Sequence, residues 1–251
     1  MQKRGQVTVF VVLGITVIIL VGLIFFMRDY YGLGVEPKIF IQGPLDSIKQ
    51  ELTGCIDGIA VPTIKLIAEQ GGSLDSAKYR FYNSRKVKYL CQDIPGEKAC
   101  LNSMDSVKEI EENVEEKLKS ELKSCVSEEL LKSKRGYIIS DAELQVDVKI
   151  LQQTVLVEVD YPVTVSKDGV TLELGKVKRE LPDTPLGYLY RTAHLIVDSY
   201  ARLGSFYHLP YMLEQKGNII IQVDKPYPDV IYILNKKDSE FKFVFAIEGV
   251  S

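Results

Sequence analysis

Four cysteines are the residues of this sequence whose chemistry is easiest to specify. Cys91 and Cys100 flank a Pro-Gly turn, and Cys55 and Cys125 occupy matching places in two helical segments. In an oxidising compartment such cysteines are expected to pair, and we favour Cys91 with Cys100 and Cys55 with Cys125. Two alternatives stay open, namely free or mixed thiols and a zinc site made of all four. The absence of any Cys-x-x-Cys pair disfavours zinc, because sites of that kind usually contain one.

A second candidate site is a run of basic residues interleaved with aromatic residues around a predicted hairpin turn at Asn83-Ser84. Basic side chains beside stacking rings suit an anionic ligand, such as single-stranded nucleic acid, a glycan or lipid headgroups. The alternative is a twisted hairpin whose aromatic side chains face the core. The basic residues are Lys78, Arg80, Arg85, Lys86 and Lys88, and the aromatic residues are Tyr79, Phe81, Tyr82 and Tyr89.

Little in the sequence favours catalysis. The chain has 2 histidines. His194 and Asp198 are four residues apart on a predicted helix and could act as an acid–base pair, although an ordinary hydrogen bond on a helix surface explains the spacing more simply. His208 lies in an aromatic loop. Since no nucleophile elbow, Walker loop, HExxH or Rossmann glycine motif occurs, we expect no enzyme activity, no cofactor and no metal site.

An apolar segment near the N-terminus indicates on which side of a membrane these residues lie. Val7–Met27 contains 21 residues without a charge, which as a helix would span about 31 Å, close to the thickness of a bilayer core. Lys3 and Arg4 precede it, and only Arg28 beside Asp29 follows it. The positive-inside tendency therefore places the N-terminus in the cytoplasm and the rest of a single-pass chain outside. A cleaved secretory signal is the alternative, but its apolar region should be shorter.

The distribution of charge divides the chain in the same way. Residues 1–28 contain three basic residues and no acid, whereas the remaining chain has 28 basic and 34 acidic residues. The whole chain of 251 residues has a net charge of −3, 46% hydrophobic and 26% charged residues. These values are typical of a globular protein and exclude global disorder. A slightly acidic chain also argues against general nucleic-acid binding, so we expect no specific nucleic-acid partner.

Two helices are predicted outside the membrane. Residues 28–44 are rich in Gly and Pro and are predicted to form a stalk. From residue 45 the apolar residues recur with a helical period, which Pro62 interrupts or kinks and Gly71-Gly72 ends. A second helix is predicted over residues 103–132. KQELTGCI in the first helix resembles KSELKSCV in the second, and this similarity indicates that the two helices pack face to face with one cysteine each.

The second half of the chain changes to a period of two, which predicts strands. A turn at Lys167-Asp168-Gly169 and a helix over residues 186–203 interrupt the strands. The pattern as a whole predicts an α+β fold with an N-terminal transmembrane helix, a cysteine-bearing helical pair, and an antiparallel sheet with a covering helix. The predicted strands lie within residues 144–150, 155–165, 170–174, 218–223, 230–234 and 241–247.

The N-terminal string KRGQVT resembles the class III signal of archaeal type IV pilin-like proteins. Lys3 and Arg4 match its basic segment, and the resemblance implies processing between Gly5 and Gln6. In these proteins a Glu at the position of Phe10 helps to align neighbouring subunits in a filament. The resemblance therefore implies membrane insertion but does not extend to this contact of filament assembly. The order of anchor, two cysteine-bearing helices and strands is also similar to that of uncharacterised membrane-anchored proteins of small-genome archaea.

These patterns predict a non-enzymatic, single-pass protein of an archaeal cell surface with a structural or adhesive role, and a pilin-like filament subunit if the N-terminus is processed. The expected partners are the lipid bilayer and a surface protein, a glycan or another copy of the chain. The alternative is a membrane-tethered ligand-binding or sensor-like module. The predicted parts are a cytoplasmic N-terminus (residues 1–6), a transmembrane helix (7–27), a stalk (28–44), a helical subdomain with the cysteines (45–135) and an antiparallel-sheet subdomain (136–251).

Overall fold

The computed structural model describes residues 4–30, 37–96, 100–126, 138–140, 143–167 and 169–249, and within the first helix it describes the side chains of residues 11–27. The elements of the first half are α1 (Arg4–Tyr30), α2 (Pro37–Glu69), β1 (Tyr79–Tyr82), β2 (Arg85–Asp93), β3 (Cys100–Asn102) and α3 (Val107–Cys125). The elements of the second half are β4 (Ile138–Ser140), β5 (Gln145–Ile150), β6 (Val155–Asp160), β7 (Thr164–Lys167), β8 (Val170–Glu173), β9 (Val177–Leu181), α5 (Leu186–Leu203), α6 (His208–Glu214), β10 (Ile219–Asp224), β11 (Val230–Lys236) and β12 (Lys242–Ile247).

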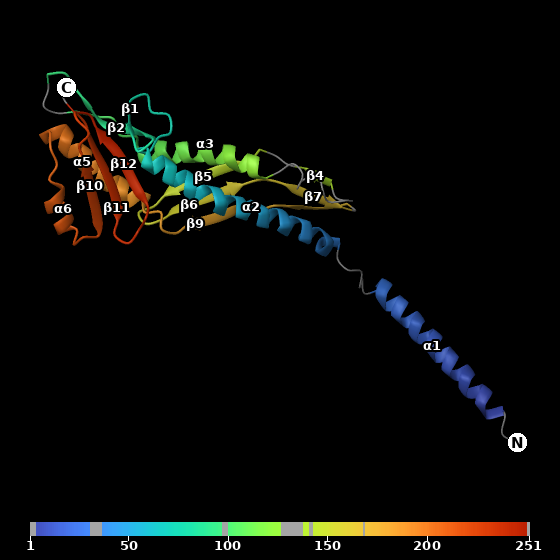
Figure 1. Cartoon of the computed structure of the whole chain (residues 1–251). Helices are drawn as coiled ribbons and strands as arrows, with labels where there is room; N and C mark the ends of the chain where they lie inside the picture. The colour runs from blue at the N-terminus through green and yellow to red at the C-terminus, as the bar shows by residue number, and fades with distance from the viewer. Residues whose placement is uncertain are drawn as a thin grey trace.

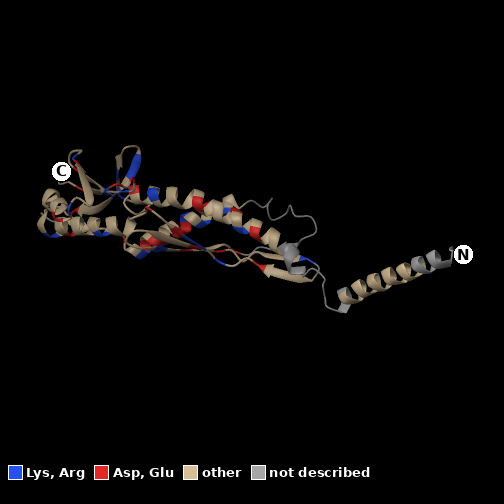
Figure 2. Cartoon of the chain, turned by 90° about the horizontal axis from the view of Figure 1, so that it is seen from below, with Lys and Arg blue, Asp and Glu red and all other residues tan. Residues whose placement is uncertain are grey.

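Helix α1 stands apart from the other elements in both overall views (Figures 1 and 2). Each of its described side chains, from residue 11 to residue 27, is exposed. The hydroxyl of Thr16 donates to the carbonyl oxygens of Val12 and Leu13, 2.8 and 2.9 Å away, so this polar group is satisfied within the helix itself. Among the described residues, no helix meets the combined length and apolarity that define a membrane span.

Helix α2 begins before residue 45, inside the segment 28–44 that the sequence predicts as a stalk, of which residues 31–36 lie outside the described residues. The helix begins at Pro37 and continues to Glu69, with Pro44 and Pro62 inside it. A proline is well tolerated at the start of a helix, where its missing N–H would have no partner in any case. The two inner prolines each remove an intrahelical hydrogen bond, and the buried apolar face of α2 offsets this loss, since Ile48, Leu52, Ile56 and Ile64 are fully buried.

Gly71 and Gly72 end α2, as the sequence predicts. Their φ angles are +80° and +93°, a region that glycine adopts without steric cost. The N–H of Gly72 donates to the carbonyl of Ile67 at 2.9 Å, and that of Gly71 donates to Ala68 at 3.3 Å. This pair of bonds is the Schellman motif, which satisfies carbonyls that the last helical turn would leave unpaired.

The predicted packing of two cysteine-bearing helices is confirmed. Helices α2 and α3 pack against each other in antiparallel directions, with Asn113 bound to the carbonyl of Gly72 at 3.4 Å and Thr63 bound to Glu121 at 2.7 Å. Helix α3 begins at Val107 rather than residue 103 because Ser106 forms its N-cap, and it ends at Cys125. Residues 127–132 of the predicted helix lie outside the described residues.

The sheets confirm the α+β class and correct the prediction of purely antiparallel pairing. Strand β2 pairs in parallel with β12, through Tyr89 with Ala246 and Cys91 with Ile247. The resulting mixed sheet has the order β1-β2-β12-β11-β10, with β3 also on β2, while β5-β6-β9 and β4-β7-β8 form two antiparallel sheets. Strands from residues 45–135 and 136–251 therefore share one sheet, and buried residues from both ranges belong to one core.

The two turns that the sequence predicts join strands as expected. Asn83 and Ser84 join β1 to β2 with φ angles of 46° and 63°, as a hairpin turn with two left-handed central residues requires. Gly169 lies between β7 and β8 with φ of +80°, whereas Asp168 lies outside the described residues. The predicted covering helix is α5, whose buried face, including Leu189 and Ile196, packs on the mixed sheet (Figure 1).

Candidate functional site

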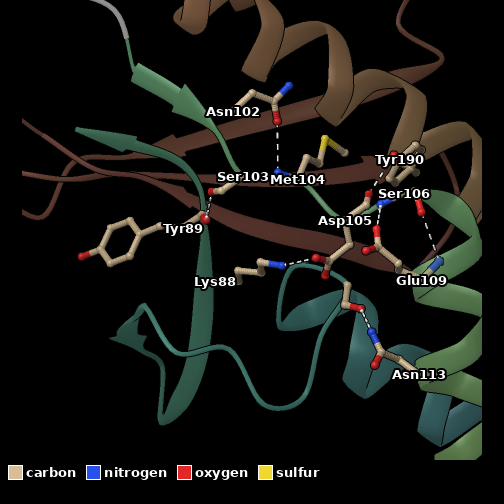
Figure 3. A network of polar contacts seen from close by, with 11 residues as sticks. Lys88, Tyr89, Asn102, Ser103, Met104, Asp105, Ser106, Glu109, Asn113 and Tyr190 are labelled. Atoms are coloured by element: carbon tan, nitrogen blue, oxygen red, sulfur yellow. Dashed lines mark hydrogen bonds and ion pairs between the residues drawn. The ribbon is translucent and has the colours of Figure 1, made fainter. Parts of the chain in front are cut away.

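A polar cleft lies where the loop after α2, strand β2, the segment before α3 and the first turns of α3 come together. Its volume is about 640 Å3. Figure 3 shows part of its wall, with Lys88, Asp105, Glu109 and Asn113 on neighbouring elements. No aromatic or large aliphatic side chain lines it; the described lining residues are Ser73, Asp75, Ser76, Ala77, Lys78, Lys88, Gln92, Ser103, Asp105, Glu109, Glu112, Asn113 and Glu116.

The segment before α3 is fixed by hydrogen bonds to two other elements (Figure 3). Ser103 donates to the carbonyl of Tyr89 in β2 at 2.8 Å, and Tyr190 of α5 donates to the carbonyl of Asp105 at 2.9 Å. The Asp105 carboxylate also forms an ion pair with Lys88. Burial raises the pKa of Tyr190, and the negative charge of Asp105 adds to the shift. This wall of the cleft is therefore preformed.

The start of α3 continues this wall through a capping box. Ser106 accepts a bond from the backbone N–H of Glu109 at 3.3 Å, and the Glu109 carboxylate accepts one from the backbone N–H of Ser106 at 2.6 Å. This reciprocal pairing satisfies two N–H groups that would otherwise lack partners. The hydrogen bond from the Ser106 backbone lowers the pKa of Glu109, so this carboxylate stays charged while it stabilises the helix.

Negative charge dominates the cleft. Five carboxylates and two ammonium groups line it, and both ammonium groups are already paired, Lys78 with Glu248 and Lys88 with Asp105. Within the described residues, Asp75 and Glu116 have no ion-pair partner, and Glu112 has only an exposed contact of 3.5 Å with Lys108. No three His, Cys, Asp or Glu side chains in the described part of the chain lie close enough together to hold a metal ion.

The basic residues of the predicted anionic-ligand patch do not form one free cationic surface. Four of the five lie against carboxylates from other elements, and Lys86 lies 4.8 Å from the centre of the Tyr79 ring. An anionic ligand would have to displace a carboxylate at each of these four positions, which disfavours the patch as an anion site. The pairs are Lys78–Glu248, Arg80–Asp229, Arg85–Glu69 and Lys88–Asp105.

Tyr89 and Asp229 form a buried polar contact beneath this hairpin. Asp229 is 3% exposed, and its carboxylate accepts hydrogen bonds from the Tyr89 hydroxyl at 2.7 Å and from the Gly249 N–H at 3.1 Å. Arg80 lies 3.2 Å from the same carboxylate. Burial raises the pKa of Tyr89 to about 12, and the adjacent Asp229 adds to the shift. The contact fastens the hairpin to the C-terminal strands.

All four cysteines are paired as the sequence favours. Cys55 bonds to Cys125 with a Cα–Cα separation of 6.0 Å, and Cys91 bonds to Cys100 with a separation of 5.4 Å. The pairing excludes the zinc site and the free thiols, because no cysteine is left over. Two disulfides are typical of proteins in an oxidising, extracytoplasmic compartment.

The structure does not bring His194 and Asp198 together as an acid–base pair. Asp198 pairs instead with Arg202, 2.9 Å away and one helical turn further on. His194 lies beside the Tyr190 ring and lines a second cavity of about 250 Å3. His208 is half-buried at the start of α6.

The proposed processing residues belong to α1. Gly5 and Gln6 lie in its first turns, where the structure describes only the backbone. Cleavage between them stays a prediction, because a helical backbone at these positions does not test it.

Sequence reasoning missed the cleft because its wall is made by an ordinary-looking helix surface. Glu109, Glu112 and Glu116 recur at a helical spacing, and alone this pattern indicates a solvated face. It becomes one wall of a cleft only because the loop after α2 brings Asp75 and Ser76 opposite. The only usable signal in the sequence is this row of carboxylates next to a polar loop.

Comparison with known proteins identifies no matching family model, no matching curated protein and no matching solved structure. The function therefore has to be inferred from the residues themselves, above all from the composition of α1, the disulfides and the polar cleft.

Proposed function

We propose that this protein is a non-enzymatic, single-pass, membrane-anchored extracytoplasmic protein with a structural or adhesive role at the cell surface. The proposal of a membrane anchor depends on one observation, the exposed apolar surface of α1. The large apolar side chains between residues 11 and 27 are 46–72% exposed and point to all sides of the helix. A helix that is apolar all round requires burial, either in a protein core or in lipid, and the whole uncharged run Val7–Met27 has the length that a bilayer requires.

Two independent features support the same orientation. Lys3 and Arg4 lie at the N-terminal end of the apolar run, which favours a cytoplasmic N-terminus. The disulfides Cys55–Cys125 and Cys91–Cys100 lie on the other side of the run, and disulfides persist in oxidising compartments outside the cytosol. Both features favour an extracytoplasmic domain that begins after α1.

The cross-links between the elements of the domain support a structural or adhesive role. Arg179 of β9 forms a bidentate ion pair with Asp57 of α2, with N–O distances of 2.8 and 2.6 Å, and a disulfide joins α2 to α3. Helix α2, the first element after α1, is therefore fastened to two other elements. A domain built in this way can present a stable contact surface to a surface protein, a glycan or another copy of the chain.

Carbonate extraction and external protease digestion of cells that express the full chain test the anchor. We expect the protein to remain in the carbonate-washed membrane, and its C-terminal domain to be digested in intact cells. A Leu13→Lys and Leu20→Lys double variant should be extracted, because two charges in the apolar run oppose insertion. A matched Leu203→Lys and Leu213→Lys variant, at exposed positions on α5 and α6, should stay in the membrane. Extraction of the wild-type protein would overturn the anchor.

N-terminal sequencing of the native protein decides whether it is processed like a pilin. A chain that begins at Gln6 would support processing and justify a search for filaments. A chain that begins at Met1 would remove the pilin-like mechanism and leave a plain signal anchor.

The second candidate function is a membrane-tethered ligand-binding module. The polar cleft beside α3 favours it, because a preformed cavity of about 640 Å3 falls within the range of small-molecule sites. Its Asp75 and Glu116 carboxylates have no ion-pair partner among the residues that the structure describes, so they do not stabilise this part of the fold through ion pairs. A structural protein with no ligand gives no reason for this arrangement, so ligand binding by the cleft separates the two candidates.

A further inference from the structure

We propose that an apolar surface on α6 and the end of α5 binds the same surface of a second copy of this chain. The inference rests on the structural or adhesive role proposed above and names the partner and the contact. We call this surface the α6 patch. Its members are Leu203, the last residue of α5, Tyr207, which precedes α6, and Leu209 and Leu213 on α6.

The α6 patch is exposed although it is apolar. Its four residues are 61–80% exposed, and Leu209 and Leu213 are four residues apart, so they share one face of the helix. All four belong to residues 203–213, the longest run without Asp, Glu, Lys or Arg after Met27. Single exposed leucines are common, whereas apolar residues gathered on one surface indicate an interaction site.

The inner face of α6 packs on the rest of the domain and holds the outer face in place. The Tyr211 and Phe206 rings are in contact, with 5.6 Å between their centroids. The sulfur of Met212 accepts the N–H of Ile221 at 3.1 Å, which covers part of the outer edge of β10, an edge strand of the mixed sheet. Since Tyr211 and Met212 fix the helix in this way, the leucines on its outer face leave water only when a partner covers them.

The area of the α6 patch fits a dimer. A large apolar residue has a surface of about 150–200 Å2, so the four residues together expose on the order of 500 Å2. Two patches in contact bury on the order of 1,000 Å2, the lower limit of a specific interface between proteins. Copies that are anchored in a membrane have a high effective concentration, which favours association through an interface of this size.

Charge favours a second copy over a lipid surface. Arg202 precedes the uncharged run and Glu214 follows it, and the Arg202 side chain is 74% exposed although it pairs with Asp198. A two-fold axis across the run places the Arg202 end of one copy beside the Glu214 end of the other, so that opposite charges meet. An anionic membrane surface would instead require a cluster of basic residues.

The charge and shape of the remaining domain favour the same contact. After residue 28 the chain has more acidic than basic residues, so two copies repel each other least where they meet through an uncharged surface. Figure 1 shows α6 at the end of the domain that is farthest from the first turn of α2. Two copies can therefore meet through their α6 patches without contact between their α2 helices.

Light scattering during size-exclusion chromatography of the full chain in uncharged detergent tests the proposal over a range of protein concentrations. We expect the protein mass to rise from one chain to two as the concentration increases. Leu203→Lys with Leu213→Lys should raise the dissociation constant about tenfold or more, because this variant places four positive charges in the interface. Circular dichroism of the variant checks that it is folded.

The matched control is Phe81→Lys with Leu101→Lys, at residues of β1 and β3 that are 65% and 57% exposed. This variant has the same net charge and should associate as the wild type does. Equal weakening by both double variants would overturn the proposal, and so would an unchanged association of the α6 variant, which would place the contact elsewhere. A wild-type chain that stays a monomer at every concentration would also overturn it and leave the α6 patch to a different protein. Carbonate extraction of the same variants reports the anchor separately, so the two proposals can fail independently.

Discussion

At the scale of single residues, Asp229 shows why the basic hairpin residues are not a free cationic surface. Its buried carboxylate is satisfied by Tyr89, Arg80 and the N–H of Gly249. The position of Gly249 permits this contact, because a Cβ there would lie only 1.8 Å from the carbonyl oxygen of Pro228. Arg80 therefore compensates a buried charge, and its exchange for a ligand would leave that charge unpaired at a cost of several kcal/mol.

The raised pKa of Tyr89 predicts a loss of stability at high pH. Its pKa is about 12 in the folded protein, against about 10 in an unfolded chain. A group whose pKa is raised by folding contributes its full stability below pH 10 and loses it as the pH rises through 12. We expect the free energy of unfolding, measured with urea, to fall between these pH values, and Tyr89→Phe to remove part of the fall.

At pH 7, Tyr89→Phe should lower the free energy of unfolding by about 1–3 kcal/mol, because it removes one donor from a buried carboxylate. The matched control is Tyr227→Phe, at a ring that is 87% exposed, and it should change little. If the free energy of unfolding depends on pH in Tyr89→Phe as it does in the wild type, the ionisation of Tyr89 does not contribute to that dependence, and the prediction is wrong.

At the scale of elements, helix α3 protects the edge of a sheet. Strand β5 is one of the two edge strands of the β5-β6-β9 sheet, and its outward backbone N–H groups have no strand partner among the described residues. Glu115 accepts the N–H of Val148 and Glu111 accepts that of Ile150, both at 2.8 Å. Unpaired edges invite association with other chains, so these two glutamates serve both stability and solubility.

Removal of one of these acceptors should destabilise the fold. Glu115→Ala leaves the N–H of Val148 without a partner, and we expect the free energy of unfolding to fall by about 1–3 kcal/mol in urea titrations. Glu115→Gln keeps an acceptor oxygen and should lose less. The neighbouring Glu116→Ala, at an exposed position on the cleft side, should stay within about 0.5 kcal/mol of the wild type. Equal losses in the two alanine variants would contradict the role of Glu115.

At the scale of the whole molecule, the local parts of the fold could be predicted and the long-range parts could not. Helical and alternating periods predict the α+β class, and a shared motif around Cys55 and Cys125 predicts the helical pair. The parallel pairing of Tyr89 with Ala246 joins segments that no local pattern connects. The partners of the basic residues were missed for the same reason, since Lys78 and Glu248 are 170 residues apart in the chain.

The shared core makes a prediction about how the molecule unfolds. Residues 45–135 and 136–251 contribute strands to one sheet and side chains to one core, so the extracytoplasmic part should unfold in a single cooperative transition. In the chain-entropy model, a bridge across 70 residues stabilises the fold by about 4 kcal/mol and one across 9 residues by about 3 kcal/mol. Replacing Cys55 and Cys125 by alanine should therefore cost more than replacing Cys91 and Cys100.

Urea titration of the full chain in detergent, followed by circular dichroism and by tyrosine fluorescence, tests both parts of this prediction. Coincident transitions in the two signals would support one cooperative unit. Because the Cys91–Cys100 bridge lies in the mixed sheet and the Cys55–Cys125 bridge lies between α2 and α3, each pair of substitutions weakens a different place in the same core. Each should therefore shift the single transition to lower urea without splitting it, whereas two separate transitions in either variant would mean that the halves fold independently.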